Sequence, residues 1–114
     1  MKNYVTVGVS SLDQIKARTA AAFRGQPQGN HISFLTVEQM WKTLSPKRMT
    51  IITAMTGAGP ISIREVARRV DRDIKAVHGD VTALIKAGVV DWQDGGVVFP
   101  YDAIHVDFVL GKAA

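Results

Sequence analysis

Residues 62–100 read SIREVARRVDRDIKAVHGDVTALIKAGVVDWQDGGVVFP, and this stretch decides the fold. Apolar residues recur at helical spacing in its first third and again in its middle, with a short polar break between the two patterns. Ser62 with Glu65 predicts a capping box that opens the first helix, and Asp73 predicts the N-cap of the second. Gly88 stands where a helix commonly ends in a left-handed residue. The stretch therefore predicts two helices joined by a tight turn.

A β-hairpin is predicted directly after these helices. Residues 89–92 and 97–100 are two short strand patterns, and Asp94-Gly95 or Gly95-Gly96 supplies the positive φ angles that a two-residue hairpin turn requires. The tip carries Gln93 and Asp94, where a hairpin that contacts DNA is expected to carry Arg or Lys. We therefore expect the hairpin to have a structural role.

The outward face of the second helix is the candidate reading surface for DNA. Its inner face is predicted to comprise Ile74, Val77, Val81, Leu84 and Ile85. The opposite face combines small residues with cations, and small residues allow a helix to approach bases in the major groove closely. The residues expected to face the bases are Arg72, Lys75, Ala76, His78, Gly79 and Thr82.

Two of these residues have other interpretations. Gly79 costs a helix about 1 kcal/mol relative to alanine. Its presence indicates either a tolerated surface glycine or tight helix packing, or else close contact with DNA or a partner. His78 lies at the border of the apolar face, where a histidine is more often a boundary residue bonded to the backbone than a base reader.

Cations also surround the first helix, where positioning helices commonly contact phosphate oxygens. The candidate phosphate contacts are Lys47, Arg48, Ser62, Arg64, Arg68 and Arg69. The alternative is an ordinary solvated helix face on which Glu65 pairs with Arg69 at i, i+4. For Lys47 and Arg48, simple surface charge is an equal alternative.

The flanking segments predict further elements. We expect a strand over 3–9, a helix capped by Ser10 or Ser11, a short strand over 31–35, a helix after Thr36, and a helix that begins at Ser45-Pro46. A final strand over 101–110 is expected to pair with the first. The predicted inner faces of the three helices comprise Leu12, Ile15, Thr19, Ala22 and Phe23; then Val37, Met40, Trp41 and Leu44; then Met49, Ile52 and Met55.

The composition predicts one globular domain with an acidic partner. The 114 residues carry a net charge of +4 and a sequence pI near 9.7, which favours nucleic acid as partner. The charge is uneven: residues 45–88 carry eight Lys/Arg and four Asp/Glu, whereas residues 89–114 carry one and four. No cysteine, signal peptide or membrane-length apolar run is visible, so we expect a cytoplasmic protein that does not contact membranes.

Catalytic patterns are not evident. His31, His78 and His105 are isolated, without the spacing of a metal-binding helix, and Gly57-Ala-Gly-Pro60 lacks the cation and spacing of a phosphate loop. We therefore expect no enzymatic activity, no metal and no cofactor.

A family resemblance is carried by Ser62-Ile-Arg-Glu-Val-Ala67, Val77-His-Gly-Asp-Val81, Leu84 and Gly88-Val-Val90. These residues resemble the winged helix-turn-helix core of MarR-like and ArsR-like prokaryotic regulators. With Leu44-Ser-Pro-Lys-Arg48 upstream, the chain is similar to short bacterial and archaeal regulators, some of them antitoxin-like. The resemblance implies an α+β winged helix-turn-helix fold with an added N-terminal strand and helix and a C-terminal strand. Within one domain over 1–114, it assigns 1–44 to the N-terminal strand and helices, 45–100 to the winged core, and 101–114 to the final strand and tail.

The functional expectation is a sequence-specific transcriptional regulator that binds double-stranded DNA as a homodimeric repressor, since symmetric dimers match two-fold DNA half-sites. The alternative is an antitoxin or adaptor module whose main role is to bind a protein partner such as a toxin. In that case the acidic segment over 89–114 would be a surface for a basic toxin.

Overall fold

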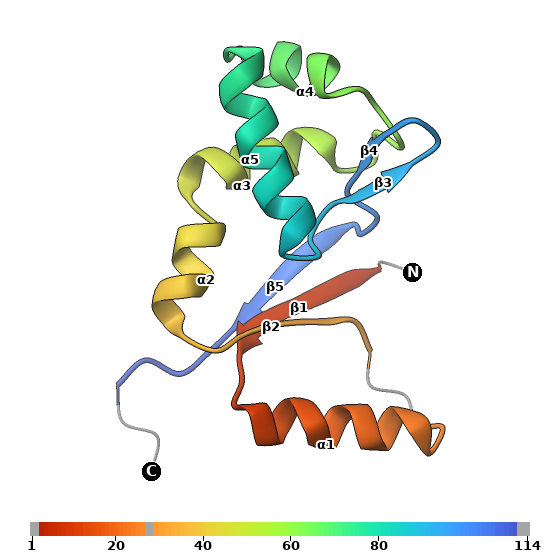
Figure 1. The fold of residues 1–114 in the computed structure, drawn as a ribbon, viewed down its shortest axis with the longest axis vertical. Coiled ribbons are helices and arrows are strands. Elements are labelled where there is room, and N and C mark those ends of the chain that lie inside the picture. The colour runs from red at the N-terminus through yellow and green to blue at the C-terminus, as the bar shows by residue number, and fades with distance from the viewer. Residues whose placement is uncertain (1–2, 27–28, 112–114) are drawn as a thin grey trace.

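The computed structural model describes residues 3–26 and 29–111, so residues 112–114 of the expected tail lie outside the described residues. These residues form a mixed α+β domain with five helices and two sheets (Figure 1). In chain order the elements are β1 (Tyr4–Val9), α1 (Leu12–Phe23), β2 (His31–Phe34), α2 (Val37–Thr43), α3 (Pro46–Met55), α4 (Ile63–Val70), α5 (Ile74–Lys86), β3 (Asp91–Gln93), β4 (Gly96–Val98) and β5 (Ala103–Asp107).

The larger sheet has the order β2-β1-β5, and both pairings are parallel. The expected pairing of the first strand with the last is confirmed, with Val5 opposite Ile104 and Val7 opposite Val106. Val5 and Val7 are fully buried, because their side chains share the face of the sheet that packs against the helices. The sheet therefore joins the two ends of the described chain.

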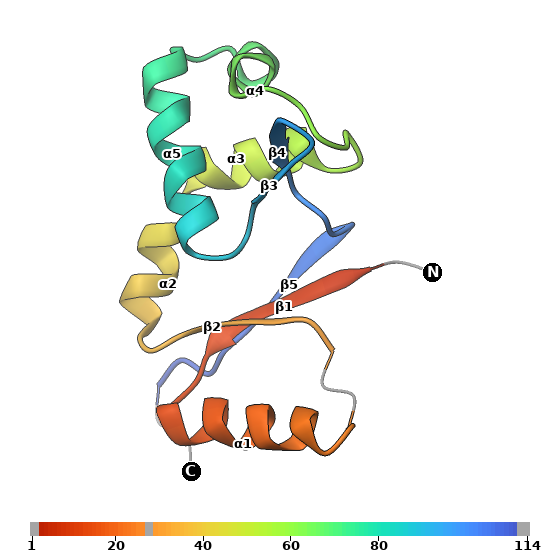
Figure 2. The same ribbon diagram turned by 45° about the vertical axis from the view of Figure 1, so that its right-hand side comes forward.

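The two faces of this sheet differ in character. Helices α2 to α5 lie on one side of it, and α1 lies on the other (Figures 1 and 2). The face toward α1 is polar, and Arg18 of α1 donates hydrogen bonds to the hydroxyls of Ser10 and Ser33. The expected buried face of α1 is wrong: the helix has no buried residue, with Leu12 60% and Phe23 88% exposed.

The helix starts are those that the sequence predicts. Ser11, Thr36, Ser45, Ser62 and Asp73 are the N-caps, and each side chain accepts a backbone N–H of its first turn. Only half of the capping box expected at Ser62 forms. The Ser62 side chain accepts the N–H of Glu65, but the carboxylate of Glu65 binds arginines instead of the Ser62 backbone.

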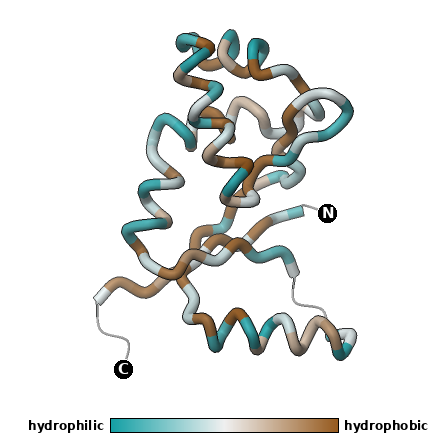
Figure 3. Tube along the Cα trace, in the orientation of Figure 1, coloured by the Kyte–Doolittle hydropathy of each residue, from teal (hydrophilic) through white to brown (hydrophobic). Residues whose placement is uncertain are grey.

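The core lies between α2, α3, α4, α5 and the sheets (Figure 3). On α3 the buried residues are Ile51, Ile52 and Met55, whereas Met49 is 42% exposed, so the expected inner position of Met49 is wrong. Trp41 on α2 was expected on the inner face and is also 42% exposed. Both side chains border an apolar groove beside β5.

The smaller sheet is the expected hairpin of β3 and β4. Asp94 and Gly95 form its turn with φ values of 52° and 77°, so the two-residue turn is confirmed. Ile61, just before α4, exchanges two backbone hydrogen bonds with Val97 of β4. This bridge fixes the hairpin to the start of α4. Within the described residues, no helix combines the length and apolarity needed to cross a bilayer.

Candidate nucleic-acid interface

Helices α4 and α5 are joined by a turn of three residues, and each residue has a defined role. Asp71 takes the left-handed conformation, with φ 54°, and ends α4. The backbone N–H of Arg72 then donates to the carbonyl of Ala67. Asp73 begins α5 by accepting the N–H groups of Lys75 and Ala76 at 3.0 and 3.2 Å. The turn therefore sets the direction in which α5 leaves α4.

Burial of the inner side of α5 determines which side is free. Val77, Val81 and Leu84 are fully buried against the core. Lys75, Ala76, His78 and Gly79 are exposed, and Thr82 is half-buried. These five expected base-facing residues therefore lie on the accessible side of α5, with Thr82 at its margin.

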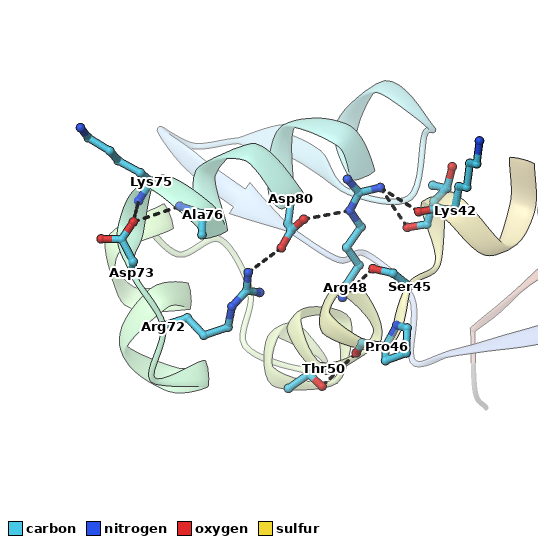
Figure 4. A network of polar contacts seen from close by, with 11 residues as sticks. Lys42, Ser45, Pro46, Arg48, Thr50, Arg72, Asp73, Lys75, Ala76 and Asp80 are labelled. Atoms are coloured by element: carbon cyan, nitrogen blue, oxygen red, sulfur yellow. Dashed lines mark hydrogen bonds and ion pairs between the residues drawn. The ribbon is translucent and has the colours of Figure 1, made fainter.

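Asp80 binds two arginines at the base of this face (Figure 4). Its Oδ1 accepts Arg48 Nε at 3.0 Å, and its Oδ2 accepts Arg72 Nη2 at 2.9 Å. Arg48 Nη1 also donates to the carbonyls of Lys42 and Thr43 at the end of α2. The side chains of Arg48 and Arg72 are each 23% exposed, and that of Asp80 is 18% exposed. One carboxylate thus joins the end of α2, α3, the turn and α5.

The pKa of Asp80 reflects this double pairing. Partial burial raises the pKa of the carboxyl, but hydrogen bonds from Arg48 and Arg72 lower it by more, so it lies below its ordinary value of 3.8. Asp80 is therefore a carboxylate at neutral pH, and it compensates two cations that are mostly withdrawn from water.

The network corrects the expected positions of two site residues. Arg72 was assigned to the base-facing group, but its guanidinium turns inward to Asp80, and its Nη1 is buried without a partner among the described residues. Arg48 was assigned to phosphate contact and is likewise held by Asp80 and two carbonyls. The sequence pattern missed both pairs because they depend on the tertiary approach of α3 to α5.

Two of the candidate phosphate ligands on α4 share one carboxylate. Arg68 binds Glu65 through two hydrogen bonds of 2.7 and 2.6 Å, and Arg69 binds it at 2.8 Å. Hydrogen bonds from Arg68 and then from Arg69 lower the pKa of Glu65 from 4.5 to about 2, and Glu65 raises the pKa of Arg68. Arg69 also donates to the carbonyl of Ala54 on α3. This is the pairing of Glu65 with Arg69 that the sequence left open, extended to Arg68.

Three of the candidate cations form no ion pair among the described residues. Lys47, Arg64 and Lys75 are exposed and form no ion pair within residues 3–26 and 29–111. The side chain of Lys75 extends away from the Asp80 network (Figure 4). Ser62 is exposed, and its hydroxyl accepts the N–H of Glu65 at the start of α4. These side chains are therefore available to bind an anionic partner.

Gly79 has open space where a side chain would be. A Cβ built there meets no atom within 4 Å, so no part of the described domain needs glycine at this position. Tight helix packing inside the domain is thereby excluded as the reason for Gly79. The tolerated surface glycine and the close approach of a partner remain as explanations.

Trp92 is a surface residue that the sequence pattern does not mark. It lies on β3 opposite Val97 and is 61% exposed. Asp91, Gln93 and Asp94 beside it are also exposed. A Trp within a strand pattern is normally read as core, so the sequence gives no signal for this exposure. Among the described residues, no group of three His, Cys, Asp or Glu side chains is placed to hold a metal ion.

The sequence profile of the HVO_A0114 family matches residues 43–106, from the end of α2 to β5. This match covers more than half of the 114 residues. The chain belongs to the HVO_A0114 family. The family segment contains α3, α4, α5 and the hairpin, and it leaves β1, α1 and β2 outside. Comparison with curated proteins and with solved structures gives no match to the chain.

Proposed function

We propose that this chain is a winged helix-turn-helix transcriptional regulator that binds duplex DNA in a sequence-specific manner, as a dimeric repressor. The observation that carries the proposal is the accessible face of α5. Its exposed residues are small at Ala76 and Gly79 and polar or cationic at Lys75 and His78. A helix with this profile can approach base edges in a major groove without a bulky side chain to hold it away.

The surroundings of α5 support the same function. Arg64 on α4 and Lys47 on α3 are exposed cations without ion pairs among the described residues, and they are suited to phosphate oxygens. In this proposal Arg48 and Arg72 orient the helices rather than contact DNA, because both are bound to Asp80. Arg68 and Arg69 together contribute one net positive charge after pairing with Glu65.

The hairpin of β3 and β4 takes the position of a wing in this proposal. Its turn carries an exposed Asp94, which phosphates would repel, so it is assigned no contact with the DNA backbone. The hairpin instead stabilises the start of α4 through Ile61 and Val97. In this proposal α5 therefore contacts the bases, and α3 and α4 contact the phosphates.

The experiment is a salt-titrated binding assay on the upstream region of the protein's own gene and on random duplex. Lys75→Ala is expected to reduce discrimination at particular bases, by about 1–3 kcal/mol in all. Arg64→Ala is expected to weaken binding to all duplexes equally and to reduce the salt slope by about one unit. Lys16→Ala on α1, which removes the same charge on the other side of the sheet, is the control. A specific-to-random ratio near one for the unmodified protein would contradict the proposal.

Gly79→Ala separates stability from recognition. Because the added Cβ meets nothing in the domain, helix propensity alone should raise the free energy of unfolding by about 1 kcal/mol. The same methyl group would hold α5 away from the bases and weaken specific DNA binding by about tenfold. Urea unfolding and the binding assay measure the two effects, and random duplex is the internal control. Greater stability with unchanged specific binding would show that Gly79 is only a tolerated surface residue.

A second candidate function is protein binding, as an antitoxin or adaptor. The specific observation in its favour is the hairpin, which exposes Trp92 together with Asp91 and Asp94 nearby in the sequence. An exposed aromatic ring among carboxylates suits a basic protein partner such as a toxin. This candidate replaces the first if the unmodified protein does not distinguish its upstream DNA from random duplex and Trp92→Ala abolishes binding to the product of an adjacent toxin-type reading frame.

A further inference from the structure

β5 is an edge strand with accessible side chains. Its only neighbour among the described strands is β1, and His105, Val106 and Asp107 are exposed. Soluble proteins usually protect such edges with proline, bulges or a covering segment, because an open edge pairs with other chains. The strand contains no proline, and the apolar residues continue past it, with Val109 70% and Leu110 81% exposed. Figure 3 shows this run in brown toward the C-terminal end.

An apolar groove of about 640 Å³ lies beside this edge. Its lining includes Trp41, Met49, Ile52, Phe99, Ile104 and Val106, from α2, α3 and the region of β5. Trp41 and Met49 are each 42% exposed at its rim, although the sequence predicts both as core residues. An open strand edge beside an open apolar groove has the composition of an interface rather than of a solvated surface.

We propose that β5 pairs antiparallel with β5 of a second copy of this chain, about a two-fold axis at Val106. The occupant of each groove is then Leu110 of the second copy, since Phe108 already packs against Trp41 of its own chain with ring centroids 5.5 Å apart. The proposal deepens the dimeric part of the proposed function and rests on it, but it does not require that the dimer bind DNA. The two three-stranded sheets would join into one sheet with a single antiparallel pair at its centre, and mixed sheets of this kind are common.

The side chains of β5 complement themselves in this register. With Val106 opposite itself, each His105 lies opposite an Asp107 of the second copy, and each Ile104 lies opposite a Phe108. Directly opposed residues share a face, so the apolar residues meet on the groove side and the polar residues meet on the side toward α1. The imidazole N–H of histidine donates to a carboxylate whether or not the ring is charged.

Neighbouring registers lack this complementarity. A shift of one residue places side chains of one strand on the wrong face of the other. A two-residue shift one way places His105 opposite His105, and a shift the other way places Asp107 opposite Asp107. Opposed carboxylates repel one another, and opposed imidazoles leave each Asp107 without a histidine donor. The charge pattern therefore selects Val106 as the centre.

The same register determines which residues of the second copy lie opposite the exposed residues that follow β5. Where the pairing extends beyond β5, which spans Ala103–Asp107, Leu110 of one copy falls opposite Asp102 of the other, on the side that carries Ile104 and Val106. Asp102 and Ile104 both line the groove, so Leu110 enters it at that end. Val109 falls opposite Ala103 on the other face. Dimerisation would thus cover the two most exposed apolar side chains of this segment.

A charge swap tests the register in the absence of DNA. In His105→Asp, both 105–107 pairs of the dimer would consist of two carboxylates. In Asp107→His, both pairs would consist of two imidazoles. Each is expected to raise the dimer dissociation constant in sedimentation equilibrium by about tenfold. The double variant H105D/D107H restores one histidine opposite each aspartate and is expected to return the constant to near that of the unmodified protein. Failure of the double variant to recover dimerisation while circular dichroism shows it folded would overturn the register.

Cysteine cross-linking gives a positive readout, because the chain contains no cysteine of its own. Directly opposed residues have Cα atoms about 4.5–5.5 Å apart, within the range of a disulfide. Val106→Cys should therefore form a covalent dimer under mild oxidation. The matched control is Val109→Cys on the same segment, whose equivalents lie about 20 Å apart along the paired strands. Faster cross-linking by His105→Cys than by Val106→Cys would also overturn the proposed centre.

These results separate the interface from the proposed function. A chain that is monomeric at 100 µM, a concentration at which functional dimers of about micromolar affinity persist, overturns the interface whatever its DNA binding. In that case the groove belongs to another occupant. A chain that forms the Val106-centred dimer but does not distinguish its DNA retains the interface and loses the regulator proposal.

Discussion

Asp80→Ala is expected to lower the free energy of unfolding by about 2–3 kcal/mol, one of the two largest effects of a single substitution in this chain. The change leaves Arg48 and Arg72 without a counter-ion while each is only 23% exposed. Removal of one partner from a fully buried ion pair costs about 3–5 kcal/mol, and the residual exposure here reduces that value. Urea unfolding followed by circular dichroism measures the loss. Asp91→Ala, which removes an exposed aspartate from β3, is the matched control and should change the midpoint little.

The Asp80 contribution should depend on pH in a defined direction. The pKa of Asp80 in the folded protein lies below 3.8, so the stabilisation is fully present above that value and is lost as the pH falls through the folded pKa. The difference between the unmodified protein and Asp80→Ala should therefore be constant near neutral pH and shrink below about pH 3.8. Equal midpoints for the two proteins at pH 7 would show that solvent already compensates both arginines.

Gly8→Ala is expected to lower the free energy of unfolding by about 3 kcal/mol. A Cβ at this position would lie well inside 3.0 Å of the carbonyl oxygen of Asp107, a distance that real Cβ atoms essentially never reach. That oxygen belongs to the backbone of β5 and cannot give way unless the strand moves away from β1. Urea unfolding measures the loss, and increased hydrogen exchange should be confined at first to β5.

Gly79→Ala is the matched control for this substitution, since the same change there meets nothing within 4 Å. The two glycine variants should shift the unfolding midpoint in opposite directions. A similar shift for both would indicate that β1 and β5 separate easily and that the close approach at Gly8 carries little of the stability.

The elements were predictable from the sequence where their signals are local. The five N-caps and the Asp94-Gly95 turn depend on residues within four positions of one another. The sequence also predicts the pairing of the first strand with the last, because both have an alternating pattern. Its parallel direction and its order in the sheet were not foreseen, since side-chain alternation is the same for either direction.

The site was less predictable, because its electrostatics depend on tertiary contacts. Helical periodicity places Arg72 outward, yet a long side chain can fold back, and Asp80 is available on the next turns of α5. Arg48 and Asp80 are 32 residues apart, so no local pattern joins them. Helical periodicity also predicts that Met49 of α3 is buried and does not predict it for Ile51. In the structure Ile51 is buried and Met49 is exposed, because this helix is covered on more than one side.

The position of β1 at the centre of the sheet has a consequence for the order in which the chain folds. Asn3 donates its backbone N–H to Asp102, 99 residues away, whereas the contacts among α3, α4, α5 and the hairpin join residues much nearer in sequence. Contacts between distant residues form late, because a long loop must close first. During synthesis the helices can therefore assemble while β1 is paired at most with β2. The central strand β1 would keep one edge without a hydrogen-bonding partner until residues 103–107 leave the ribosome.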